Sequence, residues 1–418
     1  MSKAKPWDAE AAFPEATRLR PGTRPAAAET GRAQFEQGRF AEAAAAFLEA
    51  IRLDPSNAGL RHDLGVVLDR QGKHGAAAAA FRQAVRLAPT DAPSWLALAL
   101  TSRRRGLWAD EAAAYAAAAR LRPGDADLRF ELGRALSADG RFGEAVPAFR
   151  EAARLAPGDA RRELELGIAL GRQGLHLEAE EHLRAAIRLD PTNVVAHANL
   201  ALGLGRQGRH EEAEAAYHTA IEMDPQNPRL HRGLGVTHFF LGDFAGAEAA
   251  FHAAIRLRPQ YVTAHTDLGE LLNEQGRWAE AAGAFRDALA LNPQSAAAWR
   301  GLGGALFSLE RYAEAEEAYG RAIRVTPADA RTHFLLWDVL ERQGKYAEAT
   351  AAYRAAIAVK PDLAEAHARL GRALFRLNRF AEAAAAYREA LRLNPRDEHA
   401  RAGLERALEA QQAAGKQP

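Results

Sequence analysis

The chain has 418 residues and a nearly balanced charge, with 55 lysine and arginine residues against 54 aspartate and glutamate residues. Because phosphate contacts dominate nucleic-acid affinity, this balance argues against nucleic acid as a partner. The chain contains no cysteine, which excludes disulfides, thiolate metal sites and cysteine nucleophiles.

In chain order, the first residues, MSKAKPWDAEAAFPEA, lack the apolar core of a signal peptide. No later stretch approaches the roughly 20 apolar residues of a membrane span. We therefore expect no membrane partner and a cytoplasmic location.

Prolines then recur at a constant interval of 34 residues along the chain. An alanine lies five residues before each proline, and a large apolar residue lies three residues before each alanine. Apolar residues at spacings of three and four mark one buried face of a helix. The twelve prolines of this series are Pro21, Pro55, Pro89, Pro123, Pro157, Pro191, Pro225, Pro259, Pro293, Pro327, Pro361 and Pro395.

Each 34-residue unit is predicted to form two helices. In residues 262–295, a first helix through VTAHTDLGELLNEQ ends at Gly276, and a second runs through WAEAAGAFRDALAL to Pro293. Glycine can adopt the left-handed conformation that closes a helix, whereas proline cannot extend one. One such hairpin cannot bury its apolar face alone, so the units must stack on their neighbours.

The period divides the chain into three parts. Residues 1–23 are predicted to hold the second helix of a half repeat, at residues 7–22, and residues 24–397 hold eleven complete repeats. Residues 398–418 hold a closing helix, over 398–412, and a tail, QQAAGKQP, that we expect to be disordered. Positions within a repeat are counted below from Arg24 as position 1.

This pattern resembles the tetratricopeptide repeat. The residues of one repeat that carry the resemblance are Trp299, Leu302, Gly303, Leu306, Tyr312, Ala315, Tyr319, Ala322 and Pro327. The resemblance implies an all-α fold, a right-handed superhelical solenoid of antiparallel helix pairs that serves protein–protein interaction. It covers almost the whole chain.

Several residues depart from the repeat. Trp337 occupies position 8, which is glycine or alanine in the other ten complete repeats, and Glu111 occupies a position that is otherwise alanine. Overpacking of this kind typically costs about 1–3 kcal/mol. Either residue could mark a contact, or could simply repack locally. Pro14 and Pro147 fall within predicted second helices and should kink or shorten them.

Five histidines recur at position 4: His197, His231, His265, His333 and His367. They invite a metal hypothesis, but equivalent helices lie about 8–10 Å apart, and no other ligand recurs in phase to complete a shell. We favour packing as half-buried rings with polar tips. The Gly203, Gly205 and Gly208 motif matches a dinucleotide-binding fingerprint, yet no strand is predicted before it.

No common catalytic motif occurs, and the carboxylates mostly recur on solvent-facing positions. We therefore predict no enzyme activity, no cofactor and no metal site.

In the family that the repeat resembles, positions 2, 5, 9, 12 and 13 of the first helices line a concave peptide groove. In this sequence the early groove is rich in arginine, and the later groove is rich in phenylalanine. The predicted groove residues are Arg70, Arg103, Arg104, Phe130, Arg134, Arg172, Arg206, Arg232, Phe239, Phe240, Asn273, Phe307, Phe334 and Phe375.

The arginines suit acidic peptide segments, since a guanidinium can bind a carboxylate through two hydrogen bonds. Several of them also end helices, where a cation is favoured by the helix dipole without any ligand. Both interpretations stay open.

The resemblance favours a protein–protein interaction scaffold that binds extended peptide segments. An alternative is the substrate-recruiting arm of a glycosyltransferase, because long uninterrupted arrays of this kind are similar to the repeat arm of O-linked N-acetylglucosamine transferases. In that case this chain itself would not be catalytic.

Overall fold

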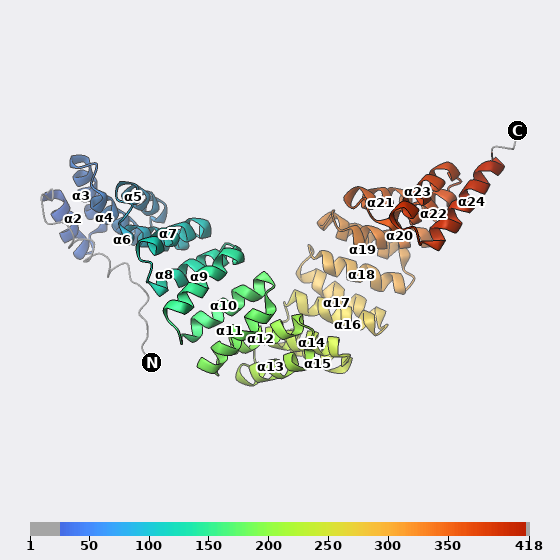
Figure 1. Cartoon of the computed structure of the whole chain (residues 1–418), viewed down its shortest axis with the longest axis horizontal. Helices are drawn as coiled ribbons and strands as arrows, with labels where there is room; N and C mark the ends of the chain where they lie inside the picture. The colour runs from blue at the N-terminus through green and yellow to red at the C-terminus, as the bar shows by residue number, and fades with distance from the viewer. Residues whose placement is uncertain (1–25, 415–418) are drawn as a thin grey trace. The chain divides into compact units, whose positions relative to one another are not determined.

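The computed structural model describes residues 26–414, apart from the side chain of residue 359, and every regular element in this range is an α-helix. The predicted half repeat at residues 7–22, and Pro14 within it, lie outside the described residues. No helix in the described range is long and apolar enough to cross a membrane. The helices fall into two units, the first ending at Arg209 and the second beginning at His210 (Figure 1).

In its described residues, the first unit contains five helix pairs followed by one further helix. Its helices are α2 (Ala26–Glu36), α3 (Phe40–Leu53), α4 (Ala58–Arg70), α5 (His74–Leu87), α6 (Ala92–Arg104), α7 (Trp108–Leu121), α8 (Ala126–Ala138), α9 (Phe142–Leu155), α10 (Ala160–Gln173), α11 (His176–Leu189) and α12 (Val194–Arg206).

The second unit begins with one helix, continues with five pairs and ends with a longer helix. Its helices are α13 (His210–Met223), α14 (Pro228–Leu241), α15 (Phe244–Leu257), α16 (Val262–Glu274), α17 (Trp278–Leu291), α18 (Ala296–Ser308), α19 (Tyr312–Val325), α20 (Ala330–Arg342), α21 (Tyr346–Val359), α22 (Ala364–Arg376), α23 (Phe380–Leu393) and α24 (Glu398–Ala414).

Within each unit, a helix packs mainly against the helices before and after it in the chain. This is the nearest-neighbour packing of a helical solenoid. Helix α24 extends to Ala414, so residues 411–414 are helical rather than part of the expected tail. Alanine and glutamine are good helix formers, which explains the extra turn.

Local sequence signals start and stop the helices. Most first helices begin after an Asn, Asp or Ser whose side chain accepts a backbone hydrogen bond, as Asp91 does from the Ser94 amide. The turn between the two helices takes a left-handed residue, which is Gly276 in the repeat singled out above, with φ +72°. Pro147 lies inside α9, but this helix keeps the 14 residues of α7 and α11, so the expected shortening is wrong.

In the eight repeats with glycine at position 8, the core depends on one close contact between the two helices. A Cβ atom added to Gly303 on α18 would lie 2.7 Å from the ring of Tyr319 on α19. Gly65 faces Phe81 in the same way, at 2.6 Å. Only glycine lets the ring lie flat on the backbone here, which explains why position 8 is small.

Trp337 occupies position 8 of its repeat with a large side chain that packs differently. Its indole is fully buried, and its ring centre lies 4.7 Å from that of Tyr353, with the two planes tilted by 40°. Two arginines of the next first helix, Arg369 and Arg372, lie over the indole at 4.8 and 5.0 Å. Cation–π attraction from α22 therefore helps to hold the large side chain. The indole Nε1 of Trp337 has no hydrogen-bond partner among the described residues.

Glu111 is the second departure, and an arginine compensates for it. The carboxylate is 1% exposed, and its Oε1 accepts a hydrogen bond of 2.6 Å from Nε of Arg103. Arg103 also pairs with Glu131 of α8. Burial raises the pKa of the Glu111 carboxyl, and the hydrogen bond from Arg103 opposes that shift. Arg103 therefore forms an ion pair with a buried carboxylate of its own repeat.

We predict that Gly303→Ala lowers the stability of the chain by about 1–3 kcal/mol, because the new methyl group must displace the Tyr319 ring. Gly304→Ala is the matched control, since its Cβ would make only an ordinary 3.7 Å contact with the Tyr319 hydroxyl. That control should be neutral or slightly stabilising. Thermal unfolding followed by circular dichroism measures both. Equal losses in the two variants would contradict the proposed role of the contact.

We further predict that Arg103→Ala lowers the stability of the chain more than Glu111→Ala does. The first change leaves a buried carboxylate unpaired, at a cost of about 1–3 kcal/mol, whereas the second restores the alanine of the other repeats. The double variant should recover most of the loss.

The loss of stability in R103A should also depend on pH. An unpaired buried carboxyl has a folded-state pKa above its unfolded-state value. The penalty is therefore present above the folded-state pKa and is relieved as the pH falls through it. Unfolding midpoints of wild type and R103A between acidic and neutral pH measure this effect, and a pH-independent difference would refute it.

Candidate peptide-binding surface

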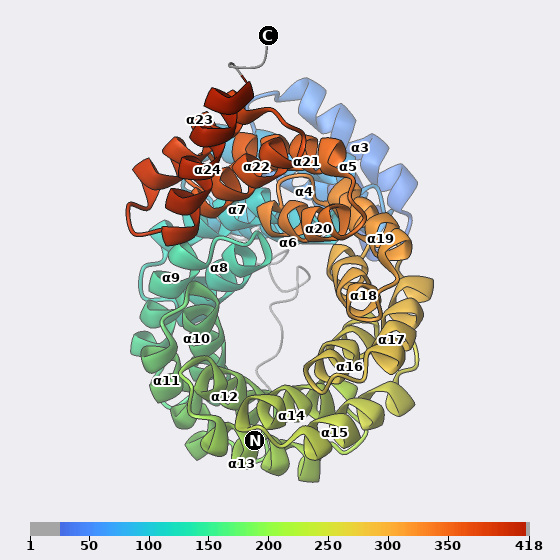
Figure 2. The ribbon, with the colours of Figure 1, turned by 90° about the vertical axis from the view of Figure 1, so that its right-hand side faces the viewer.

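The first helices of the repeats line one side of each unit. Figure 2 shows α8 and α10 on the inner side of the first unit's curve, with α9 and α11 outside them. In the second unit, α14, α16 and α18 lie inside α15, α17 and α19. All fourteen predicted groove residues lie on first helices, from Arg70 on α4 to Phe375 on α22. Their contacts divide them into several classes.

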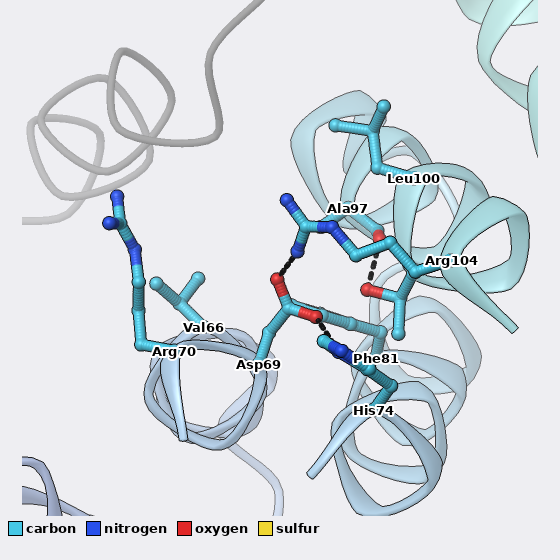
Figure 3. A pocket seen from close by; sticks show the side chains of 9 residues that line it. Val66, Asp69, Arg70, His74, Phe81, Ala97, Leu100 and Arg104 are labelled. Atoms are coloured by element: carbon cyan, nitrogen blue, oxygen red, sulfur yellow. Dashed lines mark hydrogen bonds and ion pairs between the residues drawn. The ribbon is translucent and has the colours of Figure 1, made fainter. Parts of the chain in front are cut away.

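A cavity of about 270 Å³ lies between α4, α5 and α6 in the first unit. Its walls include Val66 and Leu100, and Arg70 and Arg104 lie at its edge. Figure 3 shows Asp69 between two partners, with Arg104 on one side and His74 on the other. Nδ1 of His74 is 2.7 Å from the Asp69 carboxylate. Arg104 is therefore neutralised inside the cavity.

Two more of the early arginines are paired. Arg103 binds Glu111 and Glu131, and Arg134 lies 3.3 Å from the Glu131 carboxylate on its own helix. In the second unit, Nε of Arg232 lies 2.6 Å from the carboxylate of Asp267. These three arginines would have to give up an ion pair in order to bind an acidic ligand.

Arg172 and Arg206 differ from the arginines above. Both are exposed, and neither has an ion-pair partner among the described residues. They occupy the same repeat position on α10 and α12. Leu202, on α12, is 51% exposed, and Ile168, on α10, is half-buried. We call these four residues the arginine strip.

Three of the predicted phenylalanines pack against an aromatic residue on the other side of the turn between the two helices. The rings of Phe239 and Phe244 have centres 6.0 Å apart. Phe307 pairs with Tyr312 at 5.6 Å, and Phe375 pairs with Phe380 at 5.4 Å. Each pair joins position 12 to the first residue of the second helix. An aromatic residue at position 17 follows each of these phenylalanines by five residues, and this spacing would have predicted the ring pairs from the sequence.

Phe130 and Phe334, both at position 5, are covered by arginines of the following repeat. The guanidinium of Arg161 lies 4.8 Å from the centre of the Phe130 ring, and that of Arg369 lies 4.8 Å from the centre of the Phe334 ring. Phe130 is buried, and Phe334 is half-buried. The sequence analysis did not single out these covering arginines.

Phe240 is the most exposed of the predicted phenylalanines, at 63%. Its ring stacks on that of His210, with centres 5.0 Å apart and planes within 8°. Asn273, in contrast, donates a hydrogen bond of 3.4 Å to the Gly301 carbonyl, and its Oδ1 is buried without a partner among the described residues. Phe240 therefore offers an apolar contact surface in the second unit.

The five recurring histidines make one shared contact. In each case Nε2 lies 2.9–3.1 Å from the carbonyl oxygen of the proline six residues earlier, as in His231 with Pro225. The indole Nε1 of Trp299 donates to the Pro293 carbonyl at 2.9 Å in the same way. Because a carbonyl can only accept, Nε2 carries the proton. The histidines thus replace tryptophan as hydrogen-bonding rings, which confirms the structural interpretation of this series.

The glycines of the apparent dinucleotide motif are also accounted for by the repeat. Gly203 and Gly205 lie within α12, and Gly208 forms the left-handed turn after it, with φ +78°. A helix precedes the motif where a dinucleotide site requires a strand.

Family models agree with this architecture. Models described as tetratricopeptide repeats match residues 62–126, 130–194 and 198–261, and a further one matches residues 31–72. A model of the C-terminal domain of cilia and flagella-associated protein 70 matches residues 233–417. A comparison with curated proteins found no match to the chain.

Solved structures are similar at low sequence identity. Yeast Tom70 is 17% identical, covering 93% of this chain and 96% of that one, with a TM-score of 0.47. Cut9, in the Cut9–Hcn1 tetramer of the APC/C, is 14% identical, covering 96% and 99%, with a TM-score of 0.42. YrrB, described as having an unusual peptide-binding site, is 21% identical over 45% and 96%, with a TM-score of 0.40.

The 34-residue period, the helix pairs that pack on their neighbours and the matched repeat models lead to one conclusion. The chain belongs to the tetratricopeptide-repeat family.

Proposed function

We propose that the chain is a protein-interaction scaffold, and that the first helices of its first unit bind extended acidic peptide segments. Solenoids of this family present extended concave surfaces that suit such ligands. The observation that carries the proposal is the arginine strip, where Arg172 and Arg206 are exposed without an ion-pair partner among the described residues.

The strip has the chemistry of a peptide site. A guanidinium can hold a carboxylate through two parallel hydrogen bonds, which gives direction as well as affinity. Leu202 and Ile168 lie on the same two helices, four residues before each arginine, and offer apolar surface beside the charges. A ligand that combines acidic and apolar side chains would satisfy both.

The spacing of the strip defines the ligand further. Packed helices lie about 8–10 Å apart. A peptide in the extended polyproline II conformation advances about 3.1 Å per residue and has three residues per turn, so side chains three residues apart share one face. Two carboxylates three residues apart would therefore reach Arg172 and Arg206 together. The expected ligand is an extended segment with acidic residues at this spacing and an apolar residue between them.

In the second unit, the proposal assigns an apolar contact to Phe240. Its stacked pair with His210 presents a flat aromatic face, and aromatic side chains often supply much of the energy of protein interfaces. The other phenylalanines are engaged by their own turns or by arginines, as described above.

Binding of fluorescent peptides, followed by anisotropy, tests the proposal. A peptide with acidic residues three apart and leucine between them should bind the wild-type chain, and its lysine counterpart should not. The double change R172E/R206E should weaken binding by about 10- to 100-fold, because two charge-assisted contacts become repulsive. Raising the salt concentration should also weaken binding.

R120E/R188E is the matched control. Arg120 and Arg188 are exposed residues near the C-terminal ends of the second helices α7 and α11, and the control carries the same change in charge. If the four arginines act only on helix dipoles, both double variants will lose similar stability and will bind alike. That outcome, or failure of the acidic peptide to bind wild type, would contradict the proposal.

The glycosyltransferase-arm alternative stays a hypothesis, since no feature of the described residues favours it over a free-standing scaffold. The cytoplasmic location and the lack of catalysis also stay predictions.

A further inference from the structure

A glutamate at position 21 recurs in four second helices, and in three of them it meets a cation of the next repeat. Glu180 lies 2.6 Å from Arg209, Glu248 lies 2.6 Å from Arg277, and Glu316 lies 2.6 Å from Lys345. In each case the cation stands just before the following second helix. The repeat thus uses one ion pair at the same place in three separate contacts.

Glu214 is the fourth glutamate, and an acidic residue occupies the position where the other three have a cation. Asp243 stands where the other three repeats carry Arg209, Arg277 or Lys345. Two carboxylates therefore face this part of the second unit. Two like charges at one place are unfavourable unless a cation joins them.

His238 lies between these carboxylates, and His218 lies beside Glu214. Nε2 of His218, one turn after Glu214 on α13, lies 3.8 Å from a Glu214 oxygen. Nδ1 of His238, on α14, lies 3.8 Å from the same oxygen and 3.0 Å from an Asp243 oxygen. Leucine occupies the position of His238 in eight other repeats. The histidine therefore appears only in the repeat in which a carboxylate replaces the cation.

The turn holds His238 and Asp243 in place. The Asp243 amide donates a hydrogen bond of 2.9 Å to the His238 carbonyl, and the Asp243 carboxylate accepts one of 3.0 Å from the Gly246 amide. Gly246 stands where eight other repeats have glutamate. A Cβ at Gly246 would clash with the Asp243 carboxylate and would lie 3.1 Å from the His238 ring. The missing side chain leaves space for both groups.

We propose that Glu214, His218 and His238 bind a divalent transition-metal ion of the zinc type, with Asp243 as a fourth ligand. One ligand atom from each of the first three residues lies within 4.8 Å of the others. Ligands of a tetrahedral zinc ion, bound at about 2.0–2.2 Å, are separated by about 3.3 Å. The two histidine nitrogens lie 3.8 Å from one Glu214 oxygen, and His238 lies 3.0 Å from an Asp243 oxygen, which is close to this spacing.

The donor set fits such an ion. Imidazole nitrogens favour zinc, copper and nickel over calcium or magnesium, and two carboxylates neutralise a divalent charge. Glu214 and His218 share α13, whereas His238 and Asp243 come from α14 and the turn after it. The ion would therefore tie these two helices together, where other repeats use an ion pair. The inference does not depend on the proposed peptide binding.

Zinc titration of the untagged chain, stripped with a chelator, tests the site. Competition with a chromophoric chelator should reveal one tightly bound equivalent of Zn²⁺, and Co²⁺ should give the absorption of a tetrahedral complex. His238→Leu and His218→Arg should each weaken zinc binding at least about tenfold. Both variants introduce residues that other repeats carry at the same position, so they should fold.

His252→Arg is the matched control. His252 lies 3.9 Å from Glu248 with the same spacing of four residues as His218 and Glu214, but Glu248 already pairs with Arg277. This variant should keep the affinity of the wild type. Asp243→Arg, which restores the recurring ion pair, should abolish tight binding.

Two results would overturn the proposal. One is a chain that binds no zinc above the level of H238L. The other is a loss of affinity in H252R equal to that in H218R. In either case the histidines would serve only as hydrogen-bonding or protonated partners of the two carboxylates.

Discussion

The contact between the glycine at position 8 and the aromatic or leucine side chain of the second helix governs the architecture of the chain. Gly65 against Phe81 and Gly303 against Tyr319 bring two helix backbones as close as the ring allows. Because this contact lies in the core of the helix pair, the other core positions must keep their phase. Period, turn and proline spacing then follow.

The fold was therefore highly predictable from the sequence. The helix pairs, the turn at Gly276 and the helix ends before the prolines all follow from local signals that repeat many times. Errors arose where one residue had to be judged alone. Pro147 was expected to shorten α9, but the packing of the repeat on both sides keeps the helix at its full length.

The candidate binding surface was less predictable, because helix position alone does not specify partners. Arg103, Arg104 and Arg232 are on the expected helices, yet each is held by a carboxylate 28 or 35 residues away. These separations are close to one repeat, so the neighbouring repeat supplies the counter-charge. A search for opposite charges about one period apart would have found these pairs. Arg172 and Arg206 emerge as exceptions only after such pairing is taken into account.

Exceptions to the repeat differ in how they are compensated. Glu111 has Arg103, and Trp337 has the cations of Arg369 and Arg372, so each departure is balanced by a side chain nearby. Glu214 and Asp243 have no such side chain with a permanent charge among their described contacts. Glu111 and Trp337 are thus stabilised by side chains of the protein itself. The pair of Glu214 and Asp243 would instead be stabilised by an added cation.

A metal ion at this place would have a local mechanical effect. In a solenoid, each repeat is coupled only to its neighbours, and the free energy of a contact is shared by those neighbours alone. Metal binding adds its free energy to the folded state, because the unfolded chain does not hold the ligands together. An ion between α13 and α14 would therefore stabilise that contact selectively, and the stiffness of the second unit near its start would depend on the metal supply.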